Sequence, residues 1–119
     1  MKDEKTELRA RTKQYALQII RLYEKLPQKT VAQVLGRQVL RSGTSVGANF
    51  REAHRARSTP EFISKLGDCL KELEETAYWL ELLADANVVS AAETAAPADE
   101  TNQLTAILTS IVKKLRSKS

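Results

Sequence analysis

Residues able to perform acid–base, nucleophilic or metal chemistry are few in this chain of 119 residues. His54 is the single histidine, and Cys69, the single cysteine, lies in an apolar helical stripe where it acts as a small apolar residue. Glu52, Glu72 and Glu75 suggest the carboxylate bundle that holds two metal ions. That bundle needs a Glu-x-x-His pair on each of two helices, which one histidine cannot supply. The sequence therefore predicts a non-enzymatic protein with no catalytic residues, no metal site and no cofactor.

Arginines recur on one side of a predicted long helix. They are Arg37, Arg41, Arg51 and Arg55. At 100° per residue they fall within a sector of about 80° and extend over roughly 27 Å. Such a stripe can follow the phosphate backbone of RNA or DNA, with Arg9 and Lys13 of the preceding helix contributing. Few exposed aromatic residues accompany it, which favours backbone contact over base readout. The alternative is a set of solvated arginines, some paired with Glu72, Glu75 or Glu81 of a neighbouring helix.

Small and polar residues occupy the same predicted helix where leucines would be usual. Ser42 and Asn49 fall within its apolar stripe, so we expect both to be buried, Ser42 bonding to a carbonyl of its own helix and Asn49 to a neighbouring helix. Gly43 and Gly47 each cost about 1 kcal/mol against alanine in a helix interior. Close helix packing explains all four residues. A small ligand pocket at Asn49 and a subunit interface are the alternatives.

The next predicted helix carries more apolar surface than one bundle core can use. Tyr78, Trp79 and Leu82 project away from the stripe that contains Phe62 and Leu73. Trp and Tyr are favoured anchors of protein interfaces, so we predict a subunit interface here. The alternative is that Trp79 folds over the end of the bundle or packs on the last helix.

Charge is distributed unevenly along the chain. Residues 1–60 hold 13 Lys and Arg against 5 Asp and Glu, whereas residues 61–119 hold 6 against 10. This asymmetry indicates a basic surface for a polyanion, or a positive face that docks on a negative one within or between subunits.

Apolar residues repeat at three- and four-residue steps in four segments, and no strand pattern appears. We predict an all-α, antiparallel up-down-up-down four-helix bundle that forms one domain over residues 1–119. Thr59 is expected as the N-cap of the third helix, with Pro60 at its first position. The segment 87–96 is expected to be a loop ended by Pro97. The predicted helices span about residues 3–26, 29–57, 60–86 and 97–117.

The predicted compartment follows from hydropathy. No stretch approaches the roughly 18 to 20 apolar residues that cross a bilayer, and the first residues are charged rather than apolar. We therefore expect a cytoplasmic protein without a membrane partner. With a single cysteine, no internal disulfide is expected.

The order of these motifs resembles one bacterial family. The blocks are LRSGTSVGAN at 40–49, Glu52-Ala53, STPEFISKL at 58–66 and LKELEETAYWL at 70–80. They resemble the four-helix-bundle proteins named after 23S ribosomal RNA intervening sequences and, more distantly, the accessory variability protein of diversity-generating retroelements. The resemblance covers nearly the whole chain. It implies assembly into a closed homo-oligomeric ring, most simply a pentamer.

These observations lead to one main hypothesis and two competitors. The main hypothesis is a ring that holds RNA or DNA on its basic helices. One competitor is a scaffold that recruits a protein partner, with the basic face serving an acidic protein. The other keeps the charge asymmetry internal, with the basic helix of one subunit meeting the acidic helix of the next.

Overall fold

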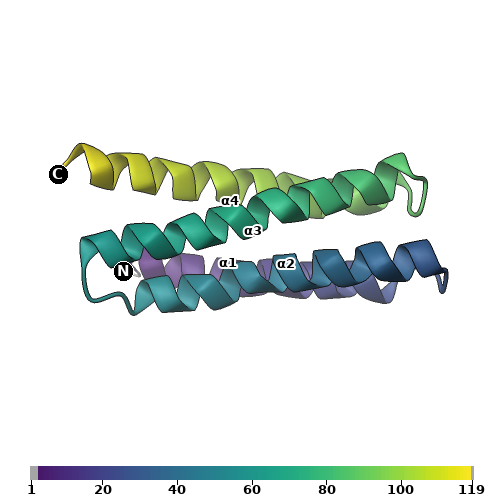
Figure 1. The fold of residues 1–119 in the computed structure, drawn as a ribbon, viewed down its shortest axis with the longest axis horizontal. Helices are drawn as coiled ribbons and strands as arrows, with labels where there is room; N and C mark the ends of the chain where they lie inside the picture. Colours follow the sequence, from purple (N-terminus) through teal and green to yellow (C-terminus); the bar gives the residue numbers. More distant parts are fainter. Residues whose placement is uncertain (1–2, 119) are drawn as a thin grey trace.

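The computed structural model describes residues 3–118 as four antiparallel α-helices joined by short turns (Figure 1). Their bounds are Glu4–Glu24 for α1, Thr30–His54 for α2, Thr59–Asp85 for α3 and Ala91–Ser117 for α4. The helices form a rod of 48 × 24 × 21 Å. The α1–α2 and α3–α4 turns lie at one end of the rod, and the α2–α3 turn lies at the other with both termini (Figure 1). The predicted all-α four-helix bundle is confirmed.

Helix starts follow local capping chemistry. The Asp3 side chain accepts a hydrogen bond from the Thr6 amide at 2.8 Å and caps α1. The Ser58 hydroxyl accepts one from the Glu61 amide at 3.2 Å and caps α3. The cap of α3 is therefore Ser58, and the expectation of Thr59 was wrong by one residue.

The start of α4 differs more from the prediction. The helix begins at Ala91 and carries Pro97 inside it, so the expected loop over 87–96 shortens to the turn before Ser90. Four of the six residues before Pro97 are alanines, the strongest helix formers, and they sustain the helix although proline removes one backbone donor. Thr101 donates its hydroxyl to the Pro97 carbonyl at 2.7 Å. Pro97 is thus an interior residue of α4 rather than its start.

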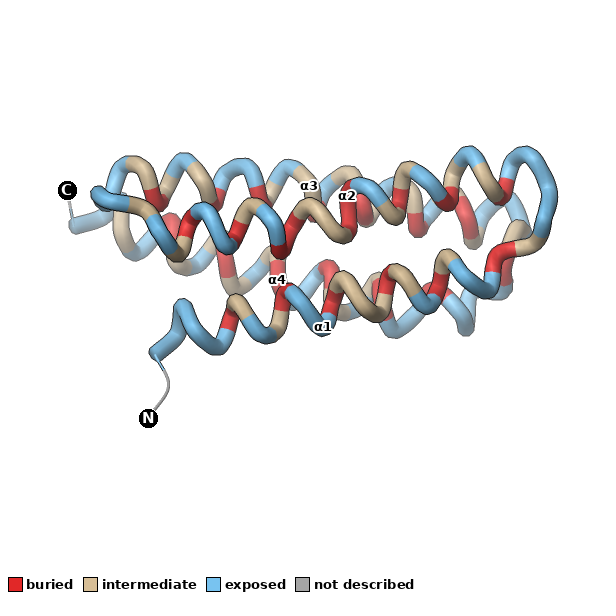
Figure 2. The backbone as a smooth tube through the Cα atoms, turned by 90° about the horizontal axis from the view of Figure 1, so that it is seen from below, coloured by how far each residue is buried: buried red, intermediate tan, exposed pale blue. Residues whose placement is uncertain are grey.

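The core lies along the axis of the rod, where the inward faces of the helices meet (Figure 2). Each helix packs on its neighbours in sequence, α2 and α3 most extensively, and the α1–α4 seam is the loosest. Val46, Phe50, Leu73 and Leu108 are fully buried. Among the described residues, no helix is long and apolar enough to cross a membrane.

Two glycines of α2 bring α1 close. A β-carbon at Gly43 would lie 2.8 Å from Cγ1 of the fully buried Ile19, and one at Gly47 would lie 3.3 Å from the Thr12 carbonyl oxygen. Any larger residue therefore pushes α1 away or displaces its buried side chains. This close approach offsets the helical cost of both glycines.

Alanine substitutions should separate this packing role from helix propensity. Gly43→Ala should lower the free energy of unfolding by about 1 kcal/mol, because overpacking against Ile19 outweighs the gain in propensity. Gly67→Ala should raise it by about 1 kcal/mol, since no atom lies within 4 Å of the added carbon. Thermal denaturation followed by circular dichroism should give Tm shifts of opposite sign, about 4 °C each. A rise in Tm for both variants would contradict the packing role of Gly43.

Candidate nucleic-acid interface

The positive charge of Arg41, in the middle of the predicted arginine stripe, is neutralised by carboxylates of α3. Its Nη2 donates to Glu75 Oε1 at 2.8 Å, and its Nη1 lies 3.3 Å from Glu72 Oε1. The pairing expected as the alternative thus occurs at this position. Two carboxylates around one guanidinium leave no net positive charge here, so Arg41 is a poor phosphate contact.

The contacts between α1 and α2 fix which of their residues lie level. Gly43 faces Ile19 and Gly47 faces Thr12, so the antiparallel register places Arg9 near the level of Arg51. Arg51 and Arg55 follow Gly47 at steps of four residues and continue along the side of α2 that flanks α1. Arg9 and Lys13 are likewise four residues apart on α1.

We call these four cations the α1–α2 basic cluster: Arg9, Lys13, Arg51 and Arg55. Arg9 is half-buried and the other three are exposed. Within residues 3–118, none of the four forms an ion pair or a side-chain hydrogen bond. Glu52 shares their side of α2 but accepts from Lys65 of α3 at 3.0 Å. The cluster therefore keeps its positive charge.

Arg37 is exposed but stands apart from this cluster. It lies fourteen residues before Arg51, about 21 Å along the helix. Because the charge of Arg41 is neutralised, the predicted stripe on α2 divides into two parts. One is the isolated Arg37, and the other is Arg51 and Arg55, which belong to the cluster. Arg9 and Lys13, expected as helpers, become half of the site.

The two polar residues of the α2 stripe have different environments. Ser42 is fully buried, and its hydroxyl lies 2.7 Å from that of Thr76 on α3, rather than bonding within its own helix. Thr76 also donates to the Glu72 carbonyl at 2.8 Å. Asn49 is only half-buried, so the expectation of a buried Asn49 was wrong. It follows Val31 by eighteen residues, or five turns, and Val31 is also exposed, at 57%. Both residues lie at the edge of the stripe rather than at its centre.

The predicted interface residues lie on α3 in graded exposure. Tyr78 is 53% exposed, Leu82 is half-buried, and Trp79 packs partly against the core with its indole Nε1 buried and unpartnered. Sequence reasoning missed Val34 of α2, which is 50% exposed. The Arg41–Glu75 and Ser42–Thr76 contacts set a register that places Val34 near the level of Leu82. Helical periodicity could have indicated that Val34 is exposed, because Val34 lies about one turn before Arg37, which is also exposed.

The chain's few reactive side chains lie apart. Cys69 is fully buried, its thiol 3.6 Å from the Val46 carbonyl, and burial raises the pKa of this thiol to about 12. His54 is half-buried beside the Phe50 ring. In the described part of the chain, no three His, Cys, Asp or Glu residues are arranged to hold a metal ion. Within residues 3–118, neither side chain is hydrogen-bonded to a second side chain that could act with it in nucleophilic catalysis.

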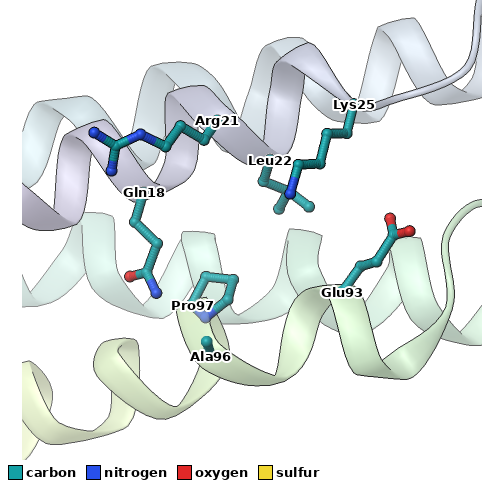
Figure 3. A pocket seen from close by; sticks show the side chains of 7 residues that line it. All are labelled: Gln18, Arg21, Leu22, Lys25, Glu93, Ala96 and Pro97. Atoms are coloured by element: carbon teal, nitrogen blue, oxygen red, sulfur yellow. The ribbon is translucent and has the colours of Figure 1, made fainter.

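A hollow of about 230 Å³ opens on the loose α1–α4 seam (Figure 3). The hollow is lined by Gln18, Arg21 and Lys25 of α1 and by Glu93 and Pro97 of α4. No ion pair bridges this stretch, whereas Arg11 and Glu100 close the seam further along at 2.7 Å. The hollow is lined by side chains of both charges.

The fold and motif order agree with known proteins. The family model for the 23S rRNA-intervening sequence protein matches residues 4–110, and the chain belongs to this family. The structure is also similar to a crystal structure from Bacteroides thetaiotaomicron, described as a protein of unknown function from the S23 ribosomal protein family. The TM-score is 0.82 at 38% identity, covering 88% of this chain and 97% of that chain. No curated protein matches significantly.

Protection of Cys69 provides a direct check of this core. Because the thiol is buried and its pKa is raised to about 12, it should not react with a thiol reagent at pH 8 in the folded protein. The same reagent should modify it rapidly in denaturant. Absorbance after adding Ellman's reagent measures both rates. Rapid modification without denaturant would contradict the packing of α3 on α2 at this position.

Proposed function

We propose that this protein binds the phosphate backbone of nucleic acid through the α1–α2 basic cluster. The supporting observation is that four cations gather on one face of α1 and α2 and, within the described residues, none of them meets a carboxylate, whereas Arg11, Arg41 and Lys65 each do. Unpaired cations on one face of two adjacent helices are available to release counterions from a polyanion.

The role is binding rather than catalysis. The only thiol of the chain is buried with its pKa raised to about 12, and within residues 3–118 the side chain of the only histidine forms no hydrogen bond to an acid or a nucleophile. Cationic side chains hold and orient phosphates without breaking bonds. The proposal is therefore a non-enzymatic nucleic-acid-binding bundle.

The same proposal includes a homo-oligomeric ring. Tyr78, Leu82 and Val34 place apolar surface on the outer side of the α2–α3 seam, away from the α1–α2 basic cluster. An exposed apolar patch of this kind is typical of a protein interface. Five subunits, the number that the family resemblance implies, would multiply the cluster fivefold.

A protein-recruiting scaffold is the second candidate function. The observation in its favour is α3, which carries seven Asp and Glu residues against two lysines. This acidic helix suits a basic protein partner, or the basic cluster of an adjacent subunit. Salt separates the candidates, because affinity for phosphates falls linearly on a log–log scale, while a mainly apolar protein interface changes little.

Removing the cluster charges should abolish nucleic-acid binding. The quadruple variant Arg9→Gln, Lys13→Gln, Arg51→Gln and Arg55→Gln should lose more than a hundredfold in affinity at about 0.1 M salt. Four phosphate contacts give a slope of log affinity against log salt of about −2.8 to −3.6 for the wild type. Fluorescence anisotropy of labelled oligonucleotides measures both quantities.

A matched variant controls for net charge. Arg21→Gln, Lys25→Gln, Lys29→Gln and Lys71→Gln also removes four exposed cations, all outside the cluster. It should bind with nearly wild-type affinity. Equal losses in the two variants would mean that binding depends on overall charge rather than on this face.

Carboxylates introduced on the apolar patch of Val34, Tyr78 and Leu82 should dissociate the ring. Val34→Glu with Tyr78→Glu places two carboxylates on the patch, and burying them in an interface is costly. Light scattering after size-exclusion chromatography should show the mass fall from oligomer to monomer, with unchanged helicity. The control Ala106→Glu with Ser110→Glu, on exposed positions of α4, should keep the oligomer. A monomeric wild type, or an intact oligomer in the patch variant, would rule out this interface.

A further inference from the structure

Among residues 3–118, no exposed Phe, Tyr or Trp ring lies on the face that carries the α1–α2 basic cluster, and the imidazole of His54 is half-buried beside Phe50. Tyr15 and Phe50 are fully buried, and Phe62 is buried under Lys5 of α1. Tyr23 is half-buried, and its hydroxyl donates to Gln33 at 3.2 Å. Tyr78 and Trp79 belong to α3, a helix that takes no part in this face. Proteins that hold single strands without sequence preference gain about 1–3 kcal/mol per base from such rings.

The cluster also lies apart from the hollows of the surface. Three hollows follow the α1–α4 seam, one lies between α3 and α4, and one lies at the end of the rod beside Pro27 and Val88. None of these includes a residue of the cluster. A base splayed out of a single strand would find none of these hollows next to the cations.

Apart from the cations themselves, side chains able to read base edges are scarce around the cluster. Ala10 of α1 and Ala48 of α2 are exposed on the same side as the cations, and both are too short to enter a groove. The exposed amide of Gln14 lies toward the α1–α4 seam, where it lines a hollow with Glu100. The cluster therefore offers charge to a backbone and little to a base.

From this arrangement we infer that the α1–α2 basic cluster selects duplex nucleic acid over single strands, without reading sequence. The inference rests on the proposed function and specifies its ligand class. A duplex presents one charge per about 1.7 Å of axis, twice the density of one strand of that duplex. Each pair of cations spans one helical turn, about 6 Å, on a closely packed pair of helices. This short, flat array of charge matches a rigid double-stranded backbone.

The size of the preference follows from counterion release. With four phosphate contacts, the slope of log affinity against log salt concentration is about −3.6 for a duplex and −2.8 for a single strand. If neither form gains from stacking, their affinities converge near 1 M salt and differ by about sixfold at about 0.1 M. Duplexes of different base composition should bind equally.

Competition between defined oligonucleotides tests the inference. Fluorescence anisotropy with the purified full-length chain would compare a 20-base-pair DNA duplex, the matching RNA duplex and each component strand at several salt concentrations. We expect both duplexes to bind about sixfold more tightly than their strands at 0.1 M salt, with steeper slopes. The variant with all four cluster cations replaced by glutamine should lose its affinity for the duplex, and the matched control variant should keep it.

The outcomes distinguish the two proposals. Tighter binding of the single strands, or equal binding with equal slopes, would overturn the duplex preference and leave nucleic-acid binding standing. No binding to any oligonucleotide would overturn both. A duplex preference that persists in the folded cluster variant would place the binding surface elsewhere on the bundle and overturn the assignment to this face.

Discussion

The close contact of α1 with α2 at Gly43 and Gly47 is the constraint on which the candidate site depends. Without β-carbons at these positions, Ile19 and the Thr12 carbonyl approach the α2 backbone directly. The two helices consequently present their cations as neighbours on one surface instead of on two separate ridges. A wider spacing would place Arg9 and Arg51 too far apart to act on the same stretch of phosphates. The packing of the bundle and the geometry of its basic face thus have a common cause.

Buried hydroxyl pairs fix how the remaining helices align. Tyr15 and Thr101 lie 2.6 Å apart between α1 and α4, and Ser42 and Thr76 lie 2.7 Å apart between α2 and α3. A shift of one helix by a single residue would leave the Tyr15 and Ser42 hydroxyls buried without these partners, at a cost of about 1–3 kcal/mol each. Thr76 and Thr101 would keep their hydrogen bonds to carbonyls of their own helices. Apolar contacts alone tolerate such shifts more easily. The polar pairs therefore select the α1–α4 and α2–α3 registers, while the glycine contacts select the α1–α2 register that assembles the basic cluster.

Helix number, order and the presence of close packing could be predicted from periodicity and from the glycines, because each is a property of one segment. The errors arise where a neighbouring segment decides. Asn49 and Val31 share one edge of α2, and only the position of α3 determines that this edge remains open. Arg41 resembled its neighbours in sequence, and its pairing depended on Glu75 lying level with it. A proline usually marks the start of a helix, but Pro97 lies inside α4. Here the preceding alanines and the packing of α4 outweigh the loss of one backbone hydrogen-bond donor.

The fold places the charges of the basic first half and the acidic second half of the chain on different faces of the bundle. In α3, seven carboxylates outnumber two lysines, so the negative potential of this helix would direct the proposed polyanionic ligand toward α1 and α2. The Arg41–Glu72–Glu75 cluster lies between the two regions and prevents the positive potential from extending over α3. Since apolar Tyr78 and Val34 lie beyond this boundary, an interface formed there would leave the basic cluster uncovered. Subunits related by rotation would then repeat the same cationic surface around a ring, and a long rigid polyanion would gain several contacts at the entropic cost of one binding event.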